Sequence, residues 1–168
     1  MSTRGLDLNT RLWGSPWVSQ ALNAEAVYGT VLTAGLISAF AAYNPGLVML
    51  IARTVGTVAV FWAAHVYAEI VGNRDLNWRD SVREALQRSA GLLWALIVPV
   101  TCLAAAALLG LTADAAVDVA LWGATVTLAV LGWWAARQRR AGRWAKLGTA
   151  AGTAGLGVAL IALKALVH

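Results

Sequence analysis

Five long stretches of apolar residues divide the chain, with short polar segments between them. Each stretch supplies about 20 residues, the helical length that crosses the hydrocarbon core of a bilayer. The stretches are too long for buried strands and lack the alternation of half-buried ones, so we interpret them as helices. The predicted spans are residues 24–43, 47–72, 90–111, 115–136 and 144–166.

Residues that end or bend helices punctuate this pattern. Asn44-Pro45-Gly46 is so short a break that it requires an antiparallel helical hairpin, and Thr112-Ala113-Asp114 makes a second turn. Pro99 lies inside the third span, where the missing backbone donor should kink the helix or open a local gap. The predicted fold is therefore all-α, a polytopic transmembrane helical bundle of five helices that forms one domain over residues 24–168.

Two polar segments lie outside the predicted spans. Residues 1–23 form a cytoplasmic or interfacial lead-in that contains Pro16 and lacks the continuous apolar stretch of a secretory signal peptide. Residues 73–89 combine apolar positions at helical spacing with charged pairs four residues apart. We expect an amphipathic helix that lies along the cytoplasmic interface, with a solvated charged linker as the alternative.

Basic residues gather on one side of the predicted membrane. Of the 13 Lys and Arg residues, all but Arg53 and Lys164 fall in residues 1–23, 73–89 and 137–146. Two predicted spans separate each of these three segments from the next, so all three lie on the same side, and the positive-inside rule places that side in the cytoplasm. We therefore predict a cytoplasmic N-terminus and an outside C-terminus, with anionic lipid headgroups against the basic segments.

Composition supports membrane insertion and narrows the function classes. Hydrophobic residues make up 60% of the chain and charged residues 12%, against ~45–50% and ~25% in soluble domains. The net charge of +5 lies at the ends of apolar runs, so we expect no nucleic-acid partner. The single cysteine, Cys102, excludes an internal disulfide. No nucleotide-binding, zinc-protease or serine-hydrolase motif occurs, and we expect no cofactor.

Candidate chemistry rests on ionisable residues inside the spans, because a charge in hydrocarbon must be paired, hydrated or neutralised. Glu25 begins the first span, while His65 and Glu69 share one face near the end of the second. The hairpin brings these residues and Tyr28 to one depth. One hypothesis is a proton or divalent-cation site, although one His and two carboxylates are a weak ligand set for a metal. The alternative is a set of hydrogen bonds that pins the hairpin.

A second group of charges lies toward the outer side. Arg53 and Asp118 enter their spans to similar depths, and Asp114 lies a turn above Asp118. We expect an Arg53–Asp118 ion pair that fixes packing, with an anion or substrate clamp as the alternative. Lys164 should extend its amine to the outer surface.

The fifth span is rich in small residues. Gly148 and Gly152 form a GxxxG pattern that Gly155 extends. Small residues allow close approach between helices, either within the bundle or in a homodimer. The sequence does not choose between these two interfaces.

Two segments resemble small, uncharacterised integral membrane proteins of high-GC bacteria. They are EAVYGTVLTAGLISA at 25–39 and VFWAAHVYAEIVG at 60–72. The resemblance implies a multi-pass protein of the bacterial inner membrane, and it carries no activity with it. It does place Glu25, Tyr28, His65 and Glu69 in the most distinctive segments.

Three functions fit these features. A small proton- or cation-handling transporter or channel-like protein would line one water-accessible cavity with Glu25, His65 and Glu69. A non-catalytic accessory or scaffold subunit would keep those residues dry and expose a small-residue groove on the fifth span to a second copy or another membrane protein. A membrane-embedded enzyme is the weakest candidate, because no nucleophile motif occurs.

Overall fold

The computed structural model describes residues 24–43, 46–72, 78–138 and 142–167, and within those ranges it contains helices and no strand. Within those ranges five helices are long and apolar enough to cross a membrane, one for each predicted span. The predicted lead-in over residues 1–23 lies outside the described ranges. The helices are α3 (Ala24–Ala41), α4 (Leu47–Gly72), α5 (Trp78–Leu108), α6 (Ala113–Gln138) and α7 (Arg143–Val167).

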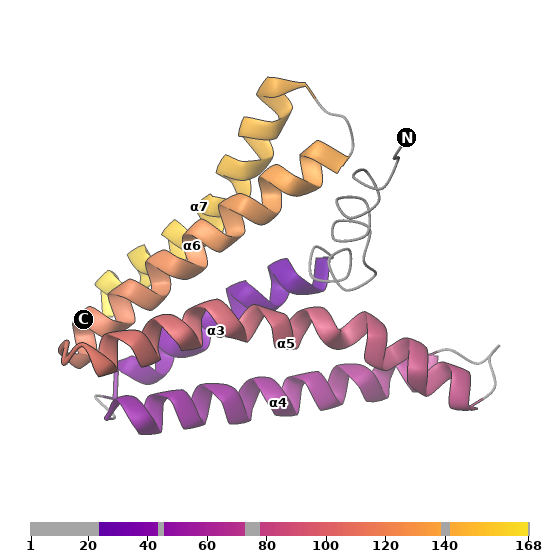
Figure 1. Ribbon diagram of the computed structural model, residues 1–168, viewed down its shortest axis with the longest axis horizontal. Coiled ribbons are helices and arrows are strands. Elements are labelled where there is room, and N and C mark those ends of the chain that lie inside the picture. Colours follow the sequence, from indigo (N-terminus) through magenta and orange to yellow (C-terminus); the bar gives the residue numbers. More distant parts are fainter. Residues whose placement is uncertain (1–23, 44–45, 73–77, 139–141, 168) are drawn as a thin grey trace, which may run out of the picture.

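The start of α5 corrects the prediction for residues 73–89. From Trp78 onward this segment is the first part of α5, which runs without interruption to Leu108, and is not a separate interfacial helix. No Gly or Pro occurs between Trp78 and Ala90, and charged side chains alone do not end a helix. Pro99 does not end α5 either, and the ribbon of α5 bows along its length (Figure 1).

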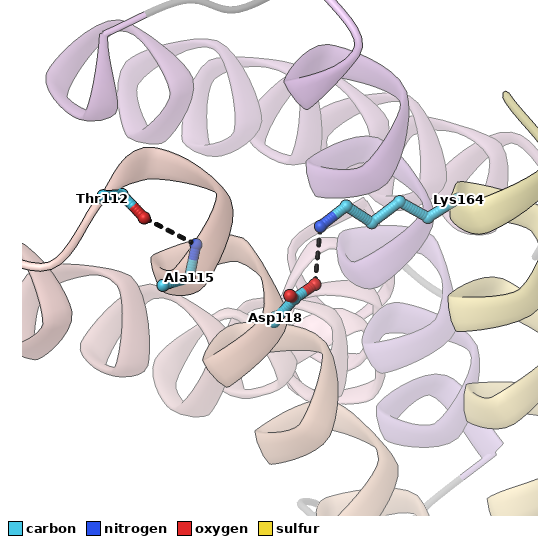
Figure 2. A network of polar contacts seen from close by, with 4 residues as sticks. All are labelled: Thr112, Ala115, Asp118 and Lys164. Carbon is cyan, nitrogen blue, oxygen red and sulfur yellow. Dashed lines mark hydrogen bonds and ion pairs between the residues drawn. The ribbon is translucent and has the colours of Figure 1, made fainter. Parts of the chain in front are cut away.

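The turn between α5 and α6 is built from backbone and side-chain caps. Gly110 has a φ of 70°, which favours glycine, and the amide of Leu111 donates to the carbonyl of Ala106 at 3.0 Å. Thr112 then accepts the amide of Ala115 on its side chain at 3.4 Å, as Figure 2 shows. These caps satisfy backbone groups at both helix ends and reverse the chain within a few residues.

The helices form two antiparallel pairs around α3. Helices α4 and α5 make one pair, α6 and α7 make the other, and α3 contacts all four. The two pairs lie close where α4 and α6 begin and diverge toward the end where α5 and α7 begin (Figure 1). We call the first the core end and the second the basic end, after the arginines of the segments that lead into α5 and α7.

The main hydrophobic core lies at the core end. Every helix except α7 supplies fully buried side chains to it, and α7 adds the partly buried Leu160 and Ile161. Its largest buried members are Ile37, Leu50, Leu103 and Leu121.

Candidate functional site

The ion pair near the core end differs from the one predicted. Asp118 of α6 pairs with Lys164 of α7, whose Nζ donates to Oδ1 at 2.6 Å (Figure 2). The predicted Arg53–Asp118 pair is therefore wrong, and Arg53 is exposed on α4. The reason is helix adjacency, because α6 packs along α7 while the main contacts of α4 are with α3 and α5. Asp114 is exposed one turn away.

The Asp118–Lys164 pair links the start of α6 to the end of α7. The Lys164 side chain is only 11% exposed, whereas that of Asp118 is 59% exposed. The amine therefore does not reach outward alone, as we had expected of Lys164. Its burial makes the nearby carboxylate necessary, since a buried ammonium without a partner is unfavourable. This arrangement is a structural connection between α6 and α7.

The predicted proton or metal cluster is not assembled as a metal site. Among the described residues, no three His, Cys, Asp or Glu side chains are placed to hold a metal ion, so the metal hypothesis for Glu25, His65 and Glu69 is wrong. No hydrogen bond or ion pair joins Glu25 to His65, although both are described and half-buried. Glu69 is half-buried and has a polar partner of its own. Tyr28 is 54% exposed.

The packing of α3 explains why Glu25 and His65 are not joined. Gly29, one turn after Glu25, lies against α5, where an added Cβ would come within 2.8 Å of the Cβ of Ala95. Ala26 and Thr30, in the same turns of α3, line a recess shared with α5 and α6. The first turns of α3 therefore contact α5 and α6, which the hairpin argument did not anticipate.

Two recesses on the described surface have apolar linings. One, of about 250 Å³, lies between α3, α5 and α6 and includes Trp94 and Thr127; the other lies at the start of α4 around Leu47 and Met49. Neither is lined by Glu25, His65 or Glu69. These two recesses therefore do not support the transport hypothesis, which requires Glu25, His65 and Glu69 to line one cavity.

Four buried side-chain polar atoms in the described part of the chain have no hydrogen-bond partner. They are Oγ1 of Thr54, Nε1 of Trp62, Nε2 of His65 and Oγ of Ser89. Sequence reasoning singled out only His65. The spacing Thr54, Val58, Trp62, His65 would have indicated the α4 group, because these steps of three or four residues keep one helix face. Ser89 gave no comparable signal.

The outward face of α7 is the other notable feature. A Cβ added at Gly148, Gly152 or Gly155 would meet no atom within 4 Å, so these glycines do not serve packing within the described bundle. The helix packs on α6 through its other side, where Gly157 lies against Thr125. Of the apolar window of α7 only 6% is buried, against 50% for α6.

No protein family, curated protein or solved structure matches this chain. The resemblance to small bacterial membrane proteins therefore stays a prediction. Two features of the structure bear on function: the outward face of α7 and the unpartnered polar atoms of α4 and α5.

Proposed function

We propose that this protein is a multi-pass protein of the bacterial inner membrane that acts as a non-catalytic accessory subunit and binds another transmembrane helix through α7. The observation that carries the proposal is the open face formed by Gly148, Gly152 and Gly155. Glycine in a helix interior costs up to about 1 kcal/mol relative to alanine. Glycines on a face that contacts only lipid would bring no compensating stabilisation. On a face that contacts another helix, they allow the two helices to pack closely.

The proposed orientation places the basic end in the cytoplasm. Arg79 and Arg83 on α5, Arg137 on α6 and Arg143 on α7 are all exposed at that end. Arg137 also lies over the ring of Trp134, 5.8 Å from its centroid. Such a combination of cationic and indole groups favours a headgroup layer rich in anionic lipid.

The size of the complex extracted from native membranes tests the accessory role. We expect wild-type protein in mild detergent to have the mass of a complex, with either a second copy or another protein added to the 17.6 kDa chain. Gly152→Leu should reduce the mass to one chain, because the larger side chain separates the docked helices. Ala59→Leu is the matched control, since Ala59 is exposed on α4, and it should leave the complex intact. Wild-type protein extracted as a single chain would exclude this role.

Proton or cation handling is the second candidate, favoured by the buried and unpartnered Nε2 of His65. A pH-jump flux assay in liposomes addresses it with His65→Ala and Glu69→Gln. Flux that is present in the wild type and lost in both variants would support it. Equal flux in protein-free and wild-type liposomes would exclude it.

A further inference from the structure

Three of the unpartnered polar atoms lie on α4 and α5, two helices that pack against each other. Trp62 and His65 lie on α4, and Ser89 lies on α5. We call these three residues the polar seam. Ser89 is 0% exposed, and Nε1 of Trp62 and Nε2 of His65 are also buried. The seam is independent of the outward face of α7, so the inference below does not rest on the accessory role.

The register of the two helices brings the seam residues to one depth. Leu50 of α4 and Leu103 of α5 meet in the core cluster and give a common reference level. At about 1.5 Å per residue, Trp62 lies ~18 Å and His65 ~22 Å from Leu50 along α4. Ser89 lies ~21 Å from Leu103 along the antiparallel α5. All three residues therefore fall within about one helical turn of each other in depth.

Three other buried hydroxyls of the described residues are satisfied within their own helices, unlike that of Thr54. Thr30, Thr33 and Thr125 each donate to the carbonyl four residues earlier, at 2.7–2.8 Å. Ser89 makes no such bond to Ala85, although serine readily does so in helices. Its hydroxyl remains available, as do the indole N–H and the imidazole nitrogen. A group of buried polar atoms without partners is unfavourable unless something binds them.

The hydrogen-bond donors and acceptors of the three side chains indicate which kind of ligand could bind at the polar seam. The indole of Trp62 can only donate, the hydroxyl of Ser89 both donates and accepts, and the imidazole of His65 does either. A metal ion is disfavoured because an indole N–H is not a ligand and because no three ligating side chains assemble among the described residues. Water donates twice and accepts twice, and buried waters typically make about three hydrogen bonds to such groups.

We propose that the polar seam is an internal water-binding site, in which ordered water bridges Trp62 and His65 of α4 to Ser89 of α5. The water supplies the hydrogen bonds that neither helix provides, and it holds the basic-end halves of α4 and α5 together. The site also places water against the one imidazole inside the predicted spans.

Nuclear magnetic resonance of the full chain in nanodiscs tests the site directly. The chain has two histidines, so His168→Gln leaves His65 as the single imidazole. The measurement is magnetisation transfer from water to the carbon-bound ring protons of His65, which do not exchange with solvent. We expect clear transfer to His65, and none to the backbone amide of Leu103, which is fully buried in the apolar core.

Two variants make the result specific to the seam. Ser89→Ala removes one partner of the water and should reduce the transfer to His65. Ser89→Val should abolish it, because the added methyl groups occupy the space. Ser81→Ala is the matched control, since Ser81 is 3% exposed on the same face two turns earlier, and it should leave the signal unchanged. Absence of transfer to His65 in folded protein, or an equal loss in Ser81→Ala, would overturn the proposal.

Discussion

The two antiparallel helix pairs of this protein meet in opposite ways. Helices α6 and α7 approach closely because glycine lies at their contacts: a Cβ at Gly157 would come within 2.9 Å of the Cα of Thr125. At that distance a side chain can reach the backbone of the neighbouring helix, and Oγ1 of Thr153 donates to the carbonyl of Leu128 at 2.8 Å. The α6–α7 interface is therefore tight and internally satisfied.

Helices α4 and α5 instead carry buried polar atoms without partners. Thr54 and Trp62 of α4 and Ser89 of α5 each bury a polar atom that makes no hydrogen bond. The two pairs therefore differ in their buried polar groups: the side-chain hydroxyl of Thr153 bridges α7 to α6, whereas α4 and α5 keep buried polar atoms without a hydrogen bond.

The largest expected effect separates the two faces of α7. We predict that Gly157→Ala destabilises the protein by about 1–3 kcal/mol, because the new Cβ meets the backbone of Thr125. Gly155→Ala, two residues away in open space, should instead stabilise the helix by about 0.5–1 kcal/mol. Unfolding by sodium dodecyl sulfate in mixed micelles measures both. Changes of the same sign would show that the two faces are equivalent.

A smaller effect is expected at the ion pair that joins α6 and α7. Asp118→Asn should destabilise the protein by about 1 kcal/mol, because Lys164 is buried while the exposed carboxylate is partly screened. Adding Lys164→Met to Asp118→Asn should recover most of that loss, since the unpaired ammonium is then removed. Asp114→Asn serves as the control and should change stability little, because Asp114 is exposed. No recovery in the double variant would mean that the pair matters through packing alone.

The helices were predictable because their signals are local. The bounds of α4 match the predicted residues 47–72, since Pro45 and Gly46 set its start. The start of α5 was not predicted, because the charged residues after Trp78 resemble a loop in hydropathy while their helix propensity remains high. Hydropathy locates the part of a helix that suits a bilayer, and it does not locate the helix end.

The candidate site was less predictable because it depends on which helices are neighbours. The sequence places the Asp118 carboxylate inside a predicted span, where it needs a cationic partner. Arg53 and Lys164 both lie at a depth from which they could pair with it. Only the packing of α6 against α7 selects Lys164. In the same way, His65 stood out as an ionisable residue in an apolar span, whereas Ser89 acquires its importance only from burial beside another helix.

The smallest expected effect tests the comparison between the pairs at two buried threonines. Thr54 on α4 and Thr125 on α6 are 0% and 5% exposed, but only Thr125 donates a hydrogen bond, to the carbonyl of Leu121 at 2.8 Å. Replacement by valine conserves the shape and removes the hydroxyl in both cases.

We predict opposite signs for these two replacements. Thr125→Val should destabilise the protein by about 1 kcal/mol, the usual net value of a hydrogen bond. Thr54→Val should be neutral or stabilise it by up to about 1 kcal/mol, because it removes a buried hydroxyl that has no partner. The same mixed-micelle unfolding experiment measures both changes. A loss at Thr54 as large as that at Thr125 would show that the α4 hydroxyl is bound, which would extend the water site of α4 and α5 toward the core end.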